Sequence, residues 1–295
     1  MKYGLIVEET NKILQQYSFK LTLRQIYYRL VAAGKIPNKK SAYNQLSDQL
    51  VKARENGDVD DTRIEDRSRQ VVERPSMFRS PDEYMQAARI WVQNLGEGYL
   101  RNLWSDQDYY VEVWVEKDAL TQVIASVIQT PLRVTTAPSR GYGSYTYLKR
   151  EAVEGRFARI NKPIKILDFR DHDPSGLNMT EDLEERMKRY GLQKNIQVKR
   201  VALSMEQIKE HGLEKLGQDV KTKDSRSKKY VEKFGDKCWE LDAIEPSKLQ
   251  KMVVDAVNEY IDKEKWDNSK LTEERDKQML TRAFKTADIT FSEDS

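Results

Sequence analysis

Residues 108–205 alternate between strand-forming and helix-forming segments, and this alternation limits the fold more than any other feature. The strand-forming segments read DYYVEVWVE, LRVTTAP, PIKILDF and IQVKRVAL, and a helical pattern follows each of the first three. Strands that alternate with helices form βαβ units and a mostly parallel sheet. Ligand-binding residues of such sheets gather at the carboxyl ends of the strands. The alternation therefore predicts an α/β domain with its site at that edge.

The regions on either side are predicted to be helical. LRQIYYRLVAAG follows Thr22, a good N-cap residue, and SAYNQLSDQLVKARENG carries an apolar stripe up to Gly57. An earlier apolar face at Leu5, Ile6, Ile13 and Leu14 predicts a first helix. Three helices followed by the polar arm DVDDTRIEDRSRQ indicate a helix-turn-helix or winged-helix unit, and we predict an all-α winged-helix domain at 1–75. A helix with a capping pattern at Ser80 makes 76–107 a helical connector, and 206–295 is predicted to be a helical C-terminal extension.

Composition sets broad limits on compartment and partners. The 295 residues suffice for two domains, and their net charge of +3 neither requires nor excludes nucleic acid. Cys238 is the only cysteine, so no internal disulfide can form, as expected in a reducing compartment. The apolar run in MKYGLIVEETNK is too short for a signal peptide, and no stretch has the length of a membrane span. We expect a soluble, cytoplasmic protein without a membrane partner.

Three acidic residues stand at predicted strand ends. Glu116 ends the first strand, and Asp171 and Asp173 follow the third strand in RDHDPSG. Residues two apart in an extended segment point the same way, with His172 turned to the other side. Crowded carboxylates repel unless a cation lies between them, and oxygen-only ligands suit Mg²⁺ or Mn²⁺. Each acid alone is explained as a helix cap, above all Asp173, but the three together predict a metal site.

The motifs VEKDAL, RGYGS and DHDPSG follow one another at these strand ends. This ordered set resembles a Toprim domain, above all that of the A subunit of type IIB topoisomerases (topoisomerase VI) and of its meiotic relative that makes double-strand breaks. The resemblance covers 108–205 and implies a Rossmann-like parallel sheet. It extends to LRQIYYRL, because the family has a winged-helix domain with a tyrosine nucleophile before the Toprim domain, and the chain would be a small member.

The resemblance implies Mg²⁺-dependent DNA cleavage by tyrosine transesterification. Tyr28 matches the nucleophile, and Arg24 would stabilise its phenolate, which forms poorly because the pKa of tyrosine is near 10. The implied product is a 5′-phosphotyrosine, with Glu116 returning a proton to the leaving hydroxyl, holding metal, or both. Alternatively both tyrosines belong to the core, as most aromatic residues on helices do. We assign Tyr27 to the core and Tyr28 to the chemistry.

Basic residues predict the surface that holds DNA. The stretch 20–40 contains six basic residues and no acid, and the helix that follows is the natural recognition helix. Phosphate contacts of this kind give weak sequence preference and strong salt dependence, whereas the alternative is an ordinary solvated face. The residues predicted to contact double-stranded DNA are Lys39, Lys40, Asn44, Lys52, Arg54, Lys117 and Arg140.

The resemblance also implies partners, and two other functions remain open. It implies a homodimer in which the tyrosine of one subunit works with the acids of the other. ATP-driven strand passage would need a separate B-type ATPase subunit, because Gln218 and Asp219 replace the Lys and Ser/Thr of a nucleotide-binding loop after Gly217. The alternatives are a metal-dependent Toprim nuclease without a covalent intermediate and a non-catalytic DNA-binding protein. Glu240 and Asp242 of ELDA, residues 240–243, are candidates to support the three acids from behind, but a capping segment is the preferred interpretation.

Overall fold

The computed structural model of the chain describes residues 2–65, 77–139, 144–192, 195–221 and 226–285. They belong to two compact units, one formed by Met1–Arg69 with Tyr109–Tyr260 and the other by Gln70–Asp108 with Ile261–Ser295. Each unit therefore joins segments that are distant in sequence. In the described part of the chain no helix combines the length and the apolar character that crossing a membrane requires.

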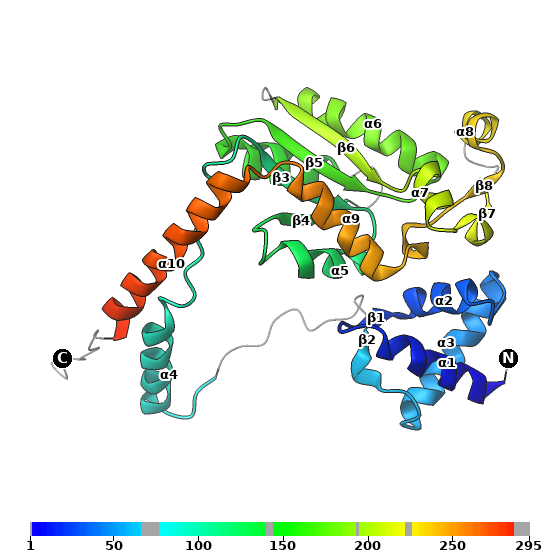
Figure 1. The fold of residues 1–295 in the computed structure, drawn as a ribbon, viewed down its shortest axis with the longest axis horizontal. Coiled ribbons are helices and arrows are strands. Elements are labelled where there is room, and N and C mark those ends of the chain that lie inside the picture. Colours follow the sequence, from blue (N-terminus) through cyan, green and yellow to red (C-terminus); the bar gives the residue numbers. More distant parts are fainter. Residues whose placement is uncertain (1, 66–76, 140–143, 193–194, 222–225, 286–295) are drawn as a thin grey trace. The chain divides into compact units, whose positions relative to one another are not determined.

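The first unit is built around a four-stranded parallel sheet (Figure 1). Its strands, in spatial order, are β4 (Thr135–Pro138), β3 (Tyr110–Val115), β5 (Ile164–Phe169) and β6 (Ile196–Ala202). The predicted parallel sheet and mixed α/β class are confirmed. Because the strands run in one direction, the loops that follow β3 and β5 meet at the same edge.

Helices cover both faces of this sheet. Helix α6 (Pro174–Arg189) and the π-helical segment Tyr147–Arg156 pack on the face that carries Trp114. Helices α5 (Asp118–Ile128) and α9 (Pro246–Asn258) cover the other face (Figure 1). Strand β3 is therefore buried on both sides, which explains its nearly continuous run of strand-forming residues.

Two charged pairs lie inside the sheet region. Asp168 is fully buried and accepts hydrogen bonds from Arg170 Nε at 2.7 Å and from Thr180 Oγ1 at 2.6 Å. Glu112 is equally buried and binds Arg156 Nε at 3.0 Å and Trp114 Nε1 at 2.8 Å. Each interior carboxylate thus has its own guanidinium and a further donor, as buried charges require.

The N-terminal part of the first unit contains α1 (Tyr3–Gln15), α2 (Leu23–Ala32) and α3 (Lys40–Glu55). The predicted cap of α2 is confirmed, because the Thr22 side chain accepts from Gln25 N. Strand β1 (Leu21–Thr22), just before α2, pairs in parallel with β2 (Ile64–Glu65). Strand β2 lies within the polar arm that follows α3. Helix α2 also contacts the turn Leu241–Ala243.

The rest of the first unit after β6 adds α7 (Met205–Glu210), α8 (Ser227–Phe234) and an antiparallel hairpin. The hairpin pairs β7 (Gln218–Asp219) with β8 (Lys237–Cys238). The prediction of a purely helical extension misses it, because strands of two residues carry no readable alternation.

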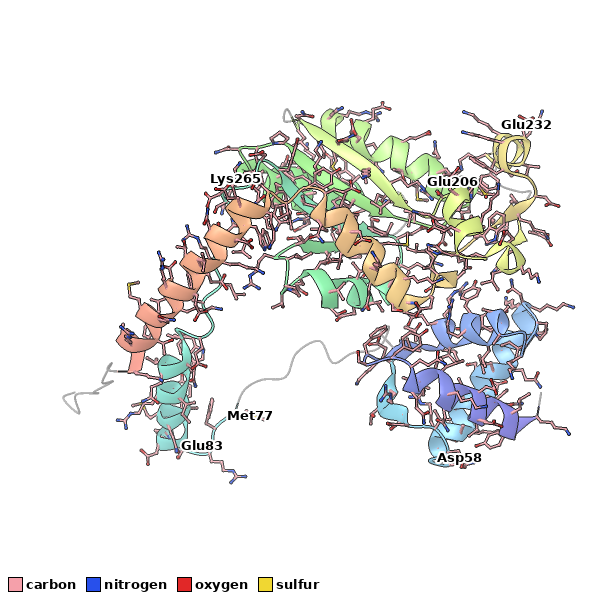
Figure 2. The ribbon with its side chains drawn as sticks, viewed as in Figure 1. Asp58, Met77, Glu83, Glu206, Glu232 and Lys265 are labelled. Carbon is pink, nitrogen blue, oxygen red and sulfur yellow. The ribbon has the colours of Figure 1, made fainter. Side chains whose placement is uncertain are left out.

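The second unit pairs α4 (Pro81–Asn94) with α10 (Lys263–Lys285). Ser80 caps α4 as predicted, by accepting from Glu83 N at 3.2 Å. No residue of α4 is buried, and Met77 just before it is 85% exposed (Figure 2). Gly96, just after α4, allows the chain to pack closely against Thr281 of α10, because a Cβ at this position would lie 2.4 Å from Thr281 N.

Candidate functional site

Two of the three predicted acids, Glu116 and Asp171, meet at the carboxyl edge of the sheet. Val115 of β3 is in register with Phe169 of β5, so the residues after these two strands are neighbours. Glu116 N donates to Phe169 O at 3.0 Å, and Asp171 N donates to Glu116 Oε2 at 3.3 Å. The structure therefore brings Glu116 and Asp171 together as the sequence predicts.

Asp173 occupies the turn that leads into α6. It is the N-cap of this helix and accepts from Gly176 N at 2.6 Å, so its expected capping role is confirmed. A Cβ on Gly176 would lie only 2.5 Å from Asp171 O, which is why the turn needs glycine. Arg200 of β6 secures the same turn from outside the motif, by donating to Asp171 O at 2.6 Å.

His172 points away from the acids, as expected. Its Nδ1 lies 2.7 Å from Tyr230 Oη, and its ring contacts Phe234 and Trp239. Burial, with a smaller contribution from Arg200, lowers the pKa of His172 to about 4. The side chain is therefore neutral near pH 7 and ties α8 to the DHDPSG turn.

Lys117 lies among carboxylates rather than on an open surface. Its Nζ is 2.9 Å from Asp242 Oδ2 and 3.1 Å from both Asp171 Oδ1 and Glu240 Oε2. Burial alone would lower the pKa of Lys117, but the three carboxylates outweigh it and raise the pKa. Asp242 Oδ1 is buried without a hydrogen-bond partner among the described residues. Lys117 therefore acts as the counter-ion of these three carboxylates, and its positive charge is not free for the phosphate contact that the sequence predicts.

Arg24 reaches the same carboxylates from α2. Its Nε donates to Glu240 Oε2 at 2.7 Å and lies 3.5 Å from Asp242 Oδ2. Burial would raise the pKa of Glu240, but Lys117 and Arg24 outweigh it and hold the pKa at about 2. We call the five residues joined by these contacts the edge network. Its members are Arg24, Lys117, Asp171, Glu240 and Asp242.

The structure corrects the interpretation of the ELDA acids. Glu240 makes no side-chain cap to the turn Leu241–Ala243 and binds Arg24 and Lys117 instead. The only sequence signal for this role is the spacing of two between Glu240 and Asp242, which places both on one side of the segment.

Both adjacent tyrosines of α2 are buried. Tyr28 is 1% exposed and accepts from Gln218 Nε2 at 3.0 Å, while Tyr27 is 5% exposed and donates to Asn38 Oδ1 at 3.1 Å. Burial raises the pKa of Tyr28, Glu240 raises it further, and Arg24 partly offsets both. Tyr27 is a core residue as assigned. Tyr28 is no more exposed, but its ring lies 5.9 Å from Arg24 Cζ, beside the edge network.

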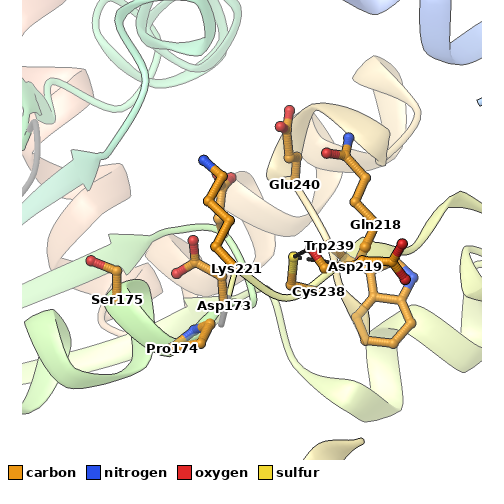
Figure 3. A pocket seen from close by; sticks show the side chains of 10 residues that line it. Asp173, Pro174, Ser175, Gln218, Asp219, Lys221, Cys238, Trp239 and Glu240 are labelled. Carbon is orange, nitrogen blue, oxygen red and sulfur yellow. Dashed lines mark hydrogen bonds between the residues drawn. The ribbon is translucent and has the colours of Figure 1, made fainter. Parts of the chain in front are cut away.

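Two cavities adjoin this region. The smaller, of about 200 Å³, is lined by Asp171, Asp173 and Glu240, among others. Figure 3 shows Asp173, Lys221 and Glu240 among the side chains that line it. The larger cavity, of about 660 Å³, is lined by Arg24, Tyr27, Tyr28, Asn38, Lys39, Lys40, Tyr43, Asn44, Gly217, Gln218, Asp219, Lys221 and Lys237. Gln218, Asp219 and Lys221 line both, so the two cavities share a wall.

Besides Lys117, which belongs to the edge network, the predicted nucleic-acid contacts divide into three groups. Lys39, Lys40 and Asn44 line the larger cavity at the start of α3. Lys52 and Arg54 are exposed in the last turn of that helix, roughly 18 Å further along at 1.5 Å per residue. Arg140 lies outside the described residues.

The carboxylate oxygens of Glu116, Asp171 and Asp173 are ligands of the kind that Mg²⁺ and Mn²⁺ prefer. Among the described residues neither Glu116 nor Asp173 has an ion pair, and burial raises the pKa of Glu116, with Asp173 adding to it. Burial also raises the pKa of Asp171 to about 7, although Lys117 opposes the shift. Burial is the main cause of both shifts, and Arg170 and Lys117 offset that of Glu116 only in part. As the described side chains stand, no three acidic, histidine or cysteine residues are grouped closely enough to hold a metal, so Glu116, Asp171 and Asp173 would have to turn toward it.

No protein-family model matches the chain, and no curated protein or solved structure matches it either. The function is therefore argued from the geometry of the site. That geometry consists of an acidic cavity, a basic cavity that contains a tyrosine, and a network of charges that connects them.

Proposed function

We propose that the chain cleaves DNA by phosphoryl transfer to Tyr28, as a topoisomerase VI A-subunit-like protein with winged-helix and Toprim domains. One observation carries the proposal. The cavity that contains Tyr28 and several cations shares a wall with the cavity that contains Asp171 and Asp173. A phosphate held by the cations would therefore lie between a nucleophile and a set of carboxylates.

The cations of the larger cavity are suited to a phosphate group. Lys39 and Lys40 stand at the start of α3, where the backbone N–H groups add to their positive charge. Arg24 lies beside the ring of Tyr28, where it would stabilise a phenolate and the charge of the transferring phosphate. Its pairing with Glu240 fixes its direction.

The reaction balances in one displacement. The Tyr28 oxygen forms a bond to phosphorus, the bond from phosphorus to the 3′-oxygen breaks, and the Tyr28 proton leaves with a base. The products are a 5′-phosphotyrosine and a free 3′-hydroxyl. Glu116 suits the role of proton donor to the leaving oxygen, because burial raises its pKa. Alternatively, Glu116 would be deprotonated and would hold a Mg²⁺ ion together with Asp171 and Asp173, and this ion would supply positive charge to the phosphate oxygens.

The proposal includes a homodimer and, for strand passage, a separate ATPase subunit. Within one chain the edge network already links the helix of Tyr28 to Asp171. Mixing Tyr28→Phe protein with Asp171→Asn protein tests how the subunits share the work. Cleavage by the mixture means that tyrosine and acids come from different subunits, and its absence means that both come from one.

A metal-dependent nuclease is the second candidate, and the burial of Tyr28 favours it. Tyr28 is 1% exposed and its pKa is raised, so its hydroxyl is a poor nucleophile until the site opens. In this case water attacks phosphorus, and Asp171 and Asp173 act without Tyr28.

One experiment separates the two. Supercoiled plasmid is incubated with the protein and Mg²⁺ or Mn²⁺, and the protein is then denatured. Tyrosine transfer leaves protein on the 5′ ends of the DNA in wild type and Tyr27→Phe, and none in Tyr28→Phe. Free ends that persist in Tyr28→Phe identify a nuclease, and the proposal of DNA cleavage fails if wild type and Asp171→Asn leave the plasmid equally intact.

A further inference from the structure

We propose that the larger cavity accepts a single DNA strand separated from its complement, and not an intact duplex. This inference rests on the proposed function and specifies its substrate. It is carried by three features of the cavity: its charge, its exposed ring and amide, and the depth of Tyr28.

The charge of the lining is strongly positive. The cations Arg24, Lys39, Lys40, Lys221 and Lys237 outnumber the single acid of the lining, Asp219, although Arg24 is already paired with Glu240 behind the lining. Asp219 is itself paired with Lys237 at 2.5 Å. Among the described residues, Lys39, Lys40 and Lys221 have no carboxylate within ion-pair distance, and they remain available to a sugar–phosphate backbone.

The same lining offers surfaces for a base. Tyr43 is partly exposed, meets Tyr27 edge to face with ring centroids 5.3 Å apart, and has Arg24 Cζ 6.0 Å from its own centroid. Asn44, one residue further, presents an exposed amide. Aromatic rings beside backbone-binding cations are typical of sites for single strands, because bases free of a complement can stack on them.

The depth of Tyr28 argues against a duplex. Its side chain is 1% exposed, and its oxygen is bound by Gln218 of β7 on the opposite wall. The space, about 660 Å³, has the size of a small-molecule pocket and lies between α2 and α3 on one side and the β7–β8 hairpin on the other. A duplex keeps its bases stacked inside a stiff cylinder, whereas an unpaired strand can bend a phosphate inward, as base-extruding enzymes require of their substrates.

Binding by the Tyr28→Phe protein tests this inference without cleavage. The probes are a fluorescein-labelled 20-mer, its duplex, and a duplex with a central unpaired bubble, compared by anisotropy in one buffer. We expect the single strand and the bubble to bind about tenfold more tightly than the duplex, the scale of one stacked base. Equal or tighter binding of the duplex overturns the inference.

Tyr43 supplies the matched variants. In the Tyr28→Phe background, Tyr43→Leu keeps apolar bulk but removes the ring, and it should weaken single-strand binding about five- to tenfold while leaving duplex binding unchanged. Tyr43→Phe keeps the ring and should bind as the parent does. Equal losses for both probes in Tyr43→Leu mean that the ring acts only in packing, and they contradict the inference.

The two proposals fail separately. If the protein prefers the single strand but wild type does not cleave the plasmid, the proposed cleavage is wrong and the proposed binding site stands. If wild type cleaves the plasmid but the protein shows no preference for the single strand, the proposed cleavage stands and the single-strand site is wrong. Failure to bind all three probes overturns both.

Discussion

The buried pair Asp168–Arg170 directly precedes Asp171 of the edge network in the sequence, but the pair and the network treat charge in opposite ways. Asp168 forms its ion pair with Arg170 and accepts from the Thr180 hydroxyl, and Arg200 lies close enough to add a second positive charge. In the edge network three carboxylates share two cations, and Glu116 and Asp173 lie beside it without an ion pair among the described residues. Balanced charge inside a sheet stabilises a fold, whereas unbalanced charge at its edge favours a cationic ligand.

Asp168→Ala breaks the balanced side of this comparison and should have the largest effect. It leaves Arg170 buried without its carboxylate, which costs about 3–5 kcal/mol of unfolding free energy. Urea unfolding followed by circular dichroism measures the loss. The double variant Asp168→Ala/Arg170→Met should recover most of it, because the orphaned charge is gone. A loss under about 1 kcal/mol in the single variant contradicts a structural role for the pair.

Glu240→Gln tests the edge network through pH. The pKa of Glu240 is about 2 in the folded chain, below the ordinary value of 4.5. A lowered pKa means that the carboxylate stabilises the fold above pH 4.5 and that this contribution is lost as the pH falls toward 2. We expect Glu240→Gln to cost about 2 kcal/mol at pH 7 and progressively less below pH 4.5, by urea unfolding at each pH.

A surface ion pair supplies the control for Glu240. Glu259 binds Lys199 with both side chains well exposed, 53% and 39%. Glu259→Gln should therefore cost under about 1 kcal/mol at any pH. Equal costs for the two variants at pH 7 would show that the edge network is no stronger than a surface pair.

The sheet and the meeting of Glu116 with Asp171 were predictable, because both follow from local patterns. Strand and helix periodicity fixes the βαβ order, and parallel strands bring the ends of β3 and β5 together. The N-caps Thr22, Ser80 and Asp173 were also readable, since a cap depends on residues three apart.

The partners of the acids were not predictable, because they depend on contacts across the whole chain. Arg24 and Glu240 are 216 residues apart, and no local pattern pairs them. The burial of Tyr28 likewise depends on Gln218, which lies in a hairpin too short to show periodicity. A helix that carries two adjacent tyrosines does not show which elements will cover them.

Gly176→Ala strains the turn that holds the acids and should have an intermediate effect. The new Cβ would meet Asp171 O at 2.5 Å, and backbone cannot yield as a flexible side chain does. We expect a loss of about 1–2 kcal/mol, with displacement of Asp171. Gly191→Ala is a poor control because φ is +102° there, whereas Gly4→Ala meets nothing within 4 Å and should be neutral. Urea unfolding, with Mg²⁺-dependent cleavage beside it, checks both variants.

Substitutions of Asp173 should change the unfolding free energy least and should separate its role in the fold from its role in cleavage most clearly. Its oxygen caps α6 by accepting from Gly176 N at 2.6 Å, and asparagine caps as well as aspartate does. The unfolding free energy of Asp173→Asn should therefore lie within about 0.5 kcal/mol of the wild-type value, while that of Asp173→Ala should be about 1 kcal/mol lower. If Asp173 holds the cation, cleavage falls in both variants, because an amide carries no negative charge. Full cleavage by Asp173→Asn would leave this residue with capping as its only role, and the excess charge of the edge would then rest on Glu116 and Asp171.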